Sequence, residues 1–461
     1  MLAELSSRRS LGVLILLLGL IMINGCASRV WNEPLEDGGE TEERYGFATR
    51  LPDNDDRSFV LVAFSGGGTR SGSLAYGVLE ALRDTEIRID GERGTLLEQV
   101  DVITSVSGGA YTASYYGLFG DQIFEDFRER FLYRDWPYTY RWMLANPINL
   151  WWMGSGDYSR SDLMADYLNR NLFRGRTFSD MSRGELPLVI VNATDLNNSL
   201  TFPFIQPQFD FLCSELSSYP VAYAAMASSA VPPSFAPTAL RNYGGCERAS
   251  KDWVEYALDE GSVLSRRYGI AESLARYTGS EPMPFLRLVD GGVTDNLGVR
   301  GSMMSPVAHR GDVASMAGAF SSEELARIED VLVVMVNAEV YRPYDWSLEG
   351  EEPSIFETAA ASFGGAFYTL NNETIGQARR EFMEWGERVN RNRPDAEEPV
   401  NIHFATITFD KVRDPDRRKR FNQLPTADLT RAQVDELRAL SARLLRESPE
   451  YRSFVESISG R

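Results

Sequence analysis

The residues of this chain best suited to chemistry lie in glycine-rich turns that directly follow predicted buried strands. Ser107 stands in "SVSGG" after the apolar run "VDVIT", and Asp290 stands in "RLVDGGVTDN". A serine exposed on a sharp strand-to-helix turn can act as a nucleophile, and a carboxylate can accept its proton. The alternatives are a small residue that lets a turn close and an aspartate that caps the next helix or turn. Taken singly, neither turn distinguishes catalysis from structure.

A third turn, "FSGGGTRSG", follows the apolar run "FVLVAF". Its consecutive glycines, Gly66, Gly67 and Gly68, leave backbone N–H groups that can point at an anion, helped by the dipole of a following helix. The stretch lacks the Gly-Lys-Ser/Thr ending of a phosphate loop, and Ser71 replaces the last glycine of a dinucleotide fingerprint. A purely structural turn remains the alternative.

Composition narrows the chemistry available to these turns. The formal net charge of −19 argues against nucleic acid as a partner, because phosphates demand clustered Lys and Arg. The only two histidines, His309 and His403, lie far apart and match no metal-ligand spacing, and there are only three cysteines. We therefore expect no zinc or iron–sulfur site and no other bound metal.

The strands that must position these turns are short apolar runs separated by helical stretches. They are "FVLVAF", "VDVITSV", "LPLVIVNATDL", "PFLRLVD" and "VLVVMVN". This alternation predicts an α/β fold with a mostly parallel sheet covered by helices on both faces. Function in such sheets gathers at the carboxyl ends of the strands, where the three turns stand.

In this order, the glycine loop, the serine turn and Asp-Gly-Gly resemble the patatin-like phospholipase family. The resemblance covers roughly residues 58–340 and extends to "VNATDLNNSLTF" and "AMASSAVPPSFAP". It implies a three-layer α/β fold and a Ser–Asp dyad without histidine. The residues that match the family motifs are Ser107 as nucleophile, Asp290 as its base, Gly66, Gly67 and Gly68 as the oxyanion-hole loop, Arg70 as the basic residue of that loop, and Gly109, Gly291 and Gly292 as motif glycines.

The implied activity is hydrolysis of lipid carboxylic esters through an acyl-enzyme, with no metal or organic cofactor. Ser105 replaces the first glycine of the G-x-S-x-G pattern, and it is small enough for the turn to close. Two other readings stay open. One is a transacylase, and the other is a catalytically idle lipoprotein that serves as a lipid-binding or assembly module.

The amino terminus predicts export and lipidation. Arg8 and Arg9 precede the apolar run 11–23, which is short for a membrane span and typical of a signal peptide. The following "INGC" resembles a bacterial lipobox, so we expect cleavage after residue 25, lipid on Cys26 and a membrane-anchored lipoprotein sorted to the outer membrane. An ordinary cleaved signal with an incidental cysteine is the alternative. Residues 26–56 are polar and acidic and read as a tether.

The remaining chain divides into residues 57–345, the acyl hydrolase domain, and residues 346–461, an α+β extension without a motif of its own. An insertion near 124–183 holds four tryptophans in "YRDWPYTYRWMLANPINLWWMG". Its aromatic residues suit either a lid that contacts lipid or ordinary core packing. Cys213 and Cys246 remain for a disulfide in an oxidising compartment.

Overall fold

The computed structural model describes residues 29–35, 45–47, 57–89, 92–182, 186–246, 252–259, 261–263, 265–279, 282–302, 327–341, 346–350, 352–393 and 398–459. Its centre is an eight-stranded sheet in the order β12-β11-β2-β5-β6-β10-β9, with β7 paired to β6. The strands are β2 Ser58–Phe64, β5 Val102–Val106, β6 Leu188–Asp195, β7 Leu200–Pro203, β9 Thr238–Arg241, β10 Phe285–Val289, β11 Asp330–Val336 and β12 Asn401–Ile407. Strands β12 to β6 are parallel, whereas β7, β9 and β10 run antiparallel to their neighbours. The predicted mostly parallel sheet is therefore confirmed.

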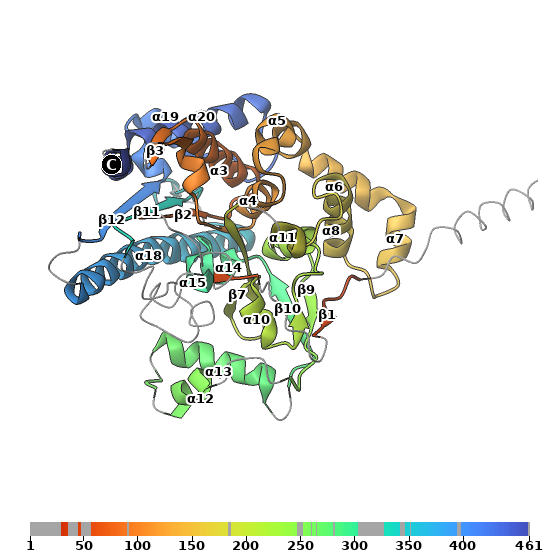
Figure 1. Cartoon of the computed structure of the whole chain (residues 1–461). Helices are drawn as coiled ribbons and strands as arrows, with labels where there is room; N and C mark the ends of the chain where they lie inside the picture. The colour runs from red at the N-terminus through yellow and green to blue at the C-terminus, as the bar shows by residue number, and fades with distance from the viewer. Residues whose placement is uncertain are drawn as a thin grey trace, which may run out of the picture.

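Helices cover both faces of this sheet, as Figure 1 shows. One face carries α3, α4, α20 and α21, and the long helix α18 lies on the other. The helices are α3 Gly68–Arg83, α4 Gly108–Phe119, α5 Ile123–Phe127, α6 Trp136–Ala145, α7 Pro147–Met153, α8 Arg160–Asn171, α9 Phe178–Ser182, α10 Gln206–Asp210, α11 Val221–Ser228, α12 Asp252–Asp259, α13 Arg266–Thr278, α14 Gly292–Asp295, α15 Val299–Ser302, α17 Trp346–Glu349, α18 Ile355–Asn392, α19 Pro415–Asn422, α20 Arg431–Glu447 and α21 Pro449–Ser459. Short turns of other helix types are η1 Leu96–Gln99, η2 Gly120–Gln122, η3 Arg128–Leu132 and η5 Phe409–Lys411.

The inner strands form where the sequence offers uninterrupted apolar and β-branched residues. Every residue of β2, β5, β6 and β11 is buried. Strands covered on both faces cannot alternate polar and apolar residues, which is why these runs are continuous. The glycine loop and the serine turn follow the parallel strands β2 and β5 and therefore lie at the same edge of the sheet. Strand β10 is antiparallel, but its last residue Val289 pairs with Thr194 near the carboxyl end of β6, which brings Asp290 to this edge.

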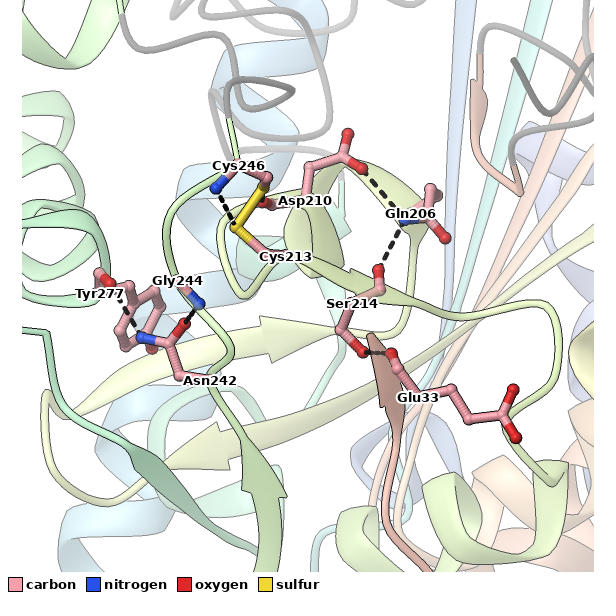
Figure 2. Close-up of a disulfide and its surroundings, with 9 residues drawn as sticks. All are labelled: Glu33, Gln206, Asp210, Cys213, Ser214, Asn242, Gly244, Cys246 and Tyr277. Atoms are coloured by element: carbon pink, nitrogen blue, oxygen red, sulfur yellow. Dashed lines mark hydrogen bonds between the residues drawn. A yellow bond between two sulfur atoms is a disulfide. The ribbon is translucent and has the colours of Figure 1, made fainter. Parts of the chain in front are cut away.

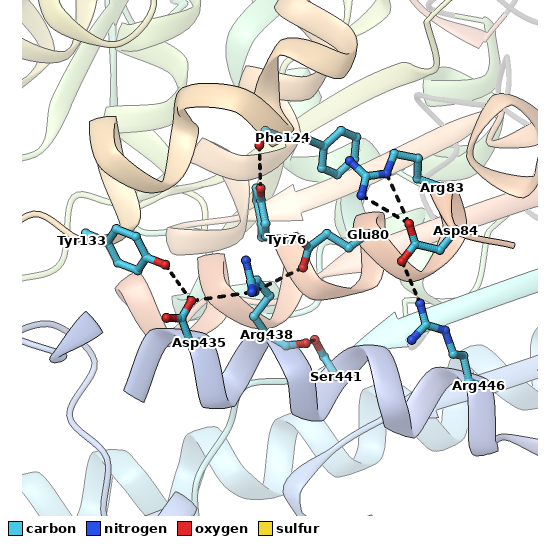
Figure 3. A network of polar contacts seen from close by, with 10 residues as sticks. All are labelled: Tyr76, Glu80, Arg83, Asp84, Phe124, Tyr133, Asp435, Arg438, Ser441 and Arg446. Carbon is cyan, nitrogen blue, oxygen red and sulfur yellow. Dashed lines mark hydrogen bonds and ion pairs between the residues drawn. The ribbon is translucent and has the colours of Figure 1, made fainter. Parts of the chain in front are cut away.

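The C-terminal extension is an integral part of this sheet. Strand β12 pairs in parallel with β11 along its whole length, and α20 packs along α3. Figure 3 shows Arg438 of α20 between Glu80 and Asp435, with Arg446 bound to Asp84 at 3.0 Å. A side chain at Gly77 of α3 would collide with the backbone of Arg438. The two helices therefore approach more closely than a larger residue would allow.

The predicted acidic tether is corrected for the parts of it that the structure describes. Strand β1 (Glu33–Pro34) pairs with β8 (Ser214–Glu215), and the buried Asn32 donates to Ser214 Oγ at 2.7 Å. Tyr45 is also buried and donates to the Val189 carbonyl at 2.7 Å. The tether prediction rested on acidic composition. Acidic composition does not reveal that single residues such as Asn32 and Tyr45 form hydrogen bonds with buried polar groups of the domain.

A disulfide joins Cys213 to Cys246, as predicted from the sequence (Figure 2). The Cys246 N–H donates to Cys213 Sγ at 3.0 Å, and the Cys213 carbonyl accepts from Leu35 N at 2.9 Å. The disulfide therefore holds in place the loop around Cys213, to which the amino-terminal segment is hydrogen-bonded.

We expect reduction of this disulfide, or Cys213→Ser with Cys246→Ser, to lower the free energy of unfolding. The sequence separation is 33 residues, for which loop-closure entropy gives about 3–4 kcal/mol. Chemical denaturation with and without reductant measures the difference. Coincident unfolding curves would contradict the prediction.

Candidate active site

Ser107 occupies a strained turn between β5 and α4. Its backbone has φ 52° and ψ −122°, a conformation that costs a residue with a side chain and that tends to occur where function requires it. The Ser107 N–H donates to Ser228 Oγ at 2.8 Å, and Ser228 Oγ in turn donates to the Asn192 carbonyl at 2.6 Å. These bonds hold the turn in place.

Small residues let this turn close. Ser105, which departs from the expected glycine, is buried and donates to the Ile190 carbonyl at 3.2 Å. A Cβ at Gly109 would lie 2.7 Å from Phe64 Cβ and 2.8 Å from the Ser65 carbonyl oxygen. A Cβ at Gly108 would collide with the backbone of Gly68. The serine turn is therefore packed directly against the glycine loop.

The glycine loop starts helix α3 beside Ser107. Gly67 and Gly68 have φ values of 135° and 59°, which glycine adopts without strain, and both line the cavity described below. The first N–H groups of a helix have no acceptor within it, so these two can face an oxyanion. Gly66 differs, because its N–H donates to the Asn296 carbonyl at 2.9 Å. The expectation that Gly66 supplies an oxyanion donor is therefore corrected, and the two following glycines remain candidates.

Arg70 anchors the glycine loop. Its side chain is buried, and it donates from Nε to the Ala338 carbonyl at 2.9 Å and from Nη1 to the Leu424 carbonyl at 2.7 Å. These bonds connect the start of α3 to the segments that follow β11 and α19. Arg70, the basic residue predicted for this loop, therefore holds the glycine loop in position.

Asp290 follows β10 and lies in the same cavity as Ser107. Its Oδ1 accepts from Gly292 N at 2.8 Å, and its backbone N–H donates to the Ala230 carbonyl at 3.2 Å. Oδ2 is buried and makes no close hydrogen bond to any other residue that the structure describes. Gly291 packs against β5 and β6, since a Cβ there would lie 3.0 Å from Val106 Cγ1. One carboxylate oxygen is thus fixed and the other is open to accept a proton.

Burial raises the pKa of Asp290 from 3.8 to about 6, although the interaction with the Ser107 hydroxyl and the Gly292 N–H each lower it. An aspartate with this pKa is a stronger base than an exposed one and is still ionised at neutral pH. Glu339 lies nearby, with its Oε2 3.5 Å from Asn296 Nδ2. Burial raises the pKa of Glu339 to about 7, and Arg70 lowers it.

We expect kcat/KM to rise with pH through about 6 and to level off above it, because only ionised Asp290 accepts a proton. The matched control is Glu339→Gln, which removes the second buried carboxylate near the site. The rise near pH 6 should persist in that variant. Its disappearance there would assign the titration to Glu339 instead of Asp290.

Ser107 and Asp290 share a cavity of about 710 Å³. Asp290 is the one charged residue among the described residues that line it. Most of the lining is apolar, contributed by Tyr111, Phe131, Trp136, Met164, Leu168, Val231, Pro232, Phe235, Val293 and Phe367. This volume lies within the usual range of ligand sites, and the lining suits an acyl chain better than a polar group.

Several lining residues were missed by the sequence analysis. Tyr111 lies one helical turn beyond Ser107, and burial raises its pKa well above its usual value, so it stays protonated. Thr426 and Ala427 come from the C-terminal extension, which carries no recognisable motif. Val231 and Phe235, by contrast, fall within "AMASSAVPPSFAP", which resembled the family without an assigned role.

The described histidine lies away from this site. His403 is buried in β12 and pairs with Asp330 of β11 at 3.0 Å. Asp330 is the first residue of β11, whereas the glycine loop and the serine turn follow the last residues of β2 and β5, which run parallel to β11. His309 lies outside the described residues.

Metal-binding clusters and membrane-spanning helices are both absent from the part of the chain that the structure describes. No cluster of three or more His, Cys, Asp or Glu side chains there could hold a metal ion. No helix there is both long and apolar enough to cross a membrane.

Solved structures that resemble this chain include the following three. The human GIVD cytosolic phospholipase A2 has 14% identity and a TM-score of 0.40, over 89% of this chain and 62% of that chain. The same human enzyme in complex with methyl gamma-linolenyl fluorophosphonate and terbium chloride has 16% identity and a TM-score of 0.39, over 87% and 60%. VipD from Legionella pneumophila has 12% identity and a TM-score of 0.25, over 92% and 73%.

This chain therefore spans about three fifths of the human enzyme's length. Comparison with curated proteins finds no match. The model of the patatin-like phospholipase family, however, matches residues 62–302, which is more than half of the chain and includes all three motif turns. The chain belongs to the patatin-like phospholipase family.

Proposed function

We propose that the protein is a serine acyl hydrolase in which Ser107 and Asp290 form the catalytic dyad. The observation that carries the proposal is their meeting in one apolar cavity, with Ser107 on a strained turn and Asp290 buried beside it. A hydroxyl, a base with an open oxygen and an acyl-sized cavity are the parts that ester cleavage requires.

In the proposed acylation, Ser107 Oγ attacks the ester carbonyl carbon while Asp290 accepts the hydroxyl proton. The resulting tetrahedral oxyanion faces the N–H groups of Gly67 and Gly68, an interaction commonly worth about 3–4 kcal/mol per donor. Collapse of this intermediate breaks the ester bond, and Asp290 returns the proton to the leaving alcohol. Water then attacks the acyl-enzyme with Asp290 again as base, releasing the fatty acid and restoring Ser107.

Pre-steady-state kinetics with a soluble p-nitrophenyl ester test this proposal. An acyl-enzyme predicts a burst of nitrophenol equal to the enzyme concentration, followed by a slower steady rate, if deacylation is the slower step. A panel of phospholipids, lysophospholipids and acylglycerols then defines the substrate. An idle binding module would give neither a burst nor turnover on any of these esters.

We further propose that the protein is anchored by lipid on Cys26 and resides at the outer membrane. The support is the sequence alone, namely the apolar run 11–23 followed by "INGC". Cys26 itself lies outside the described residues. The proposal agrees with a disulfide elsewhere in the chain, because disulfides persist in exported proteins.

We expect mass spectrometry of the membrane-extracted protein to find diacylglycerol on an N-terminal Cys26. Cys26→Ser should abolish this modification. A mature protein that begins at another residue, or that retains Met1, would contradict the prediction.

A further inference from the structure

Helices α6 and α7 present large apolar side chains to solvent. Neither helix contains a buried residue. Trp142 is 62% exposed and Trp151 is 61% exposed, and they are accompanied by exposed Tyr138, Ile148 and Leu150. The sequence left open whether this insertion packs in the core, and the structure places these side chains outside it. Contiguous exposed apolar surface on a folded protein marks an interaction site.

The charge of this segment differs from that of the whole chain. No Asp or Glu occurs from Trp136 to Gly156, and Arg141 is the one charged residue there, although the chain as a whole has a net charge of −19. A segment without acidic side chains lacks the repulsion that an anionic surface exerts on an acidic chain as a whole. Tryptophan and tyrosine also favour the boundary between lipid and water.

This face is fixed to the mouth of the cavity. The Tyr140 ring of α6 packs against Phe235 with centroids 5.0 Å apart, and its hydroxyl donates to the Ser234 carbonyl at 3.2 Å. Trp136, at the start of α6, lines the cavity together with Phe235 and the exposed Val231. A surface that meets α6 therefore also meets the rim of the cavity.

The amino-terminal segment reaches the same side of the molecule. Arg29 pairs with Asp162 of α8 at 3.5 Å and lines a surface hollow together with Gly156, which follows α7. Figure 1 shows β1 and α7 on this side. Arg29 stands three positions after Cys26, and three extended residues span at most about 11 Å. Trp31, close to Arg29 in the sequence, lies under the exposed Arg241, whose guanidinium carbon is 4.5 Å from the centroid of the Trp31 ring.

We propose that α6 and α7 form a docking surface for a lipid bilayer that carries anionic headgroups. The inference rests on the proposed hydrolase function, and it adds the orientation of the enzyme on its substrate. Trp142 and Trp151 enter the boundary between headgroups and acyl chains, while Arg141 and Arg241 face the phosphates. The cavity mouth then opens at the membrane, and an ester enters without its acyl chain crossing water.

The test compares two substrates of the full-length, lipidated protein. One is phospholipid in vesicles of phosphatidylcholine and phosphatidylglycerol, and the other is soluble p-nitrophenyl butyrate. We expect Trp142→Ser with Trp151→Ser to lower the rate on vesicles by about tenfold or more, because two large apolar contacts with lipid are lost. The rate on the soluble ester should stay at the wild-type level.

Tyr256→Ser with Val263→Ser is the matched control. These side chains are similarly exposed but lie at α12 and just before α13, away from α6 and α7 (Figure 1). The control should leave both rates unchanged.

If the variant with both tryptophans replaced hydrolyses phospholipid in vesicles at the wild-type rate, the inference is wrong, and the exposed face of α6 and α7 would instead bind a protein partner. An equal loss on both substrates would overturn it too, because the two tryptophans would then support the fold. Absence of soluble-ester hydrolysis in the wild type would instead refute the proposed function.

Discussion

Ser107→Ala is expected to lower kcat on lipid esters by roughly 10⁴–10⁶-fold, because it removes the proposed nucleophile and leaves only binding and the oxyanion loop. The melting temperature should stay close to that of the wild type. Alanine meets the same strained backbone as serine at φ 52°, and the bond between the Ser107 N–H and Ser228 Oγ does not involve the side chain. Steady-state kinetics and thermal unfolding of the same preparation measure both quantities.

Ser107→Gly is the matched control for strain at this position. It should be as inactive as Ser107→Ala but should unfold at a higher temperature, because glycine adopts a positive φ without steric cost. Hydrolysis at the wild-type rate in either variant would refute the assignment of the nucleophile.

Asp290→Asn should lower kcat by about 10²–10⁴-fold, since a neutral amide cannot accept the Ser107 proton. The geometry of the site should survive, because an amide oxygen can still accept from Gly292 N. Steady-state rates across pH 5–9 also distinguish this variant from the wild type, as the rise in kcat/KM near pH 6 should vanish with the titrating group.

The same variant should be more stable than the wild type at neutral pH. Because the folded protein binds the Asp290 proton more tightly than the unfolded chain, the free energy of unfolding falls as pH rises from 3.8 to about 6. At pH above about 6, the buried negative charge of Asp290 lowers the free energy of unfolding by at most about 3 kcal/mol. The neutral amide of the Asp290→Asn variant does not incur this cost. Low activity together with a raised melting temperature would separate a catalytic role from damage to the fold.

The histidine control addresses a hidden catalytic triad. Replacing both His309 and His403 with glutamine should leave kcat nearly unchanged, and glutamine at position 403 can still donate to Asp330. A triad would instead make loss of its histidine about as harmful as loss of the serine. Collapse of activity in a folded double variant would show that Asp290 is not the base.

The sheet, and the places of Ser107 and Asp290 on turns directly after buried strands, could be predicted from the sequence because their signals are local. Continuous apolar runs reveal strands buried on both faces, and the turns after the parallel strands β2 and β5 lie at the same edge. The antiparallel direction of β10, which ends beside β6 and places Asp290 there, was not predicted from the sequence. The disulfide followed from cysteine count and compartment. The expectation for Gly66 failed because the acceptor of its N–H, the Asn296 carbonyl, comes from a segment 230 positions later.

Long-range packing explains the other differences. Thr426 reaches the cavity only because α20 packs along α3 and β12 extends the sheet, and no local pattern around "LPTAD" reports this. Asn32 and Tyr45 are buried by pairing with distant backbone, which an acidic composition conceals. The exposure of Trp142 and Trp151 was also undetermined, since aromatic residues are typical of both cores and lipid surfaces.

The central claim is that Ser107 is a nucleophile activated within this cavity, and a fluorophosphonate tests it most directly. The reagent forms a covalent bond only with an activated hydroxyl. Peptide mass spectrometry of the labelled protein should find a single adduct on Ser107, with labelling that slows in Asp290→Asn and is absent in Ser107→Ala. An unlabelled wild-type protein, or an adduct on any other serine, would contradict the account.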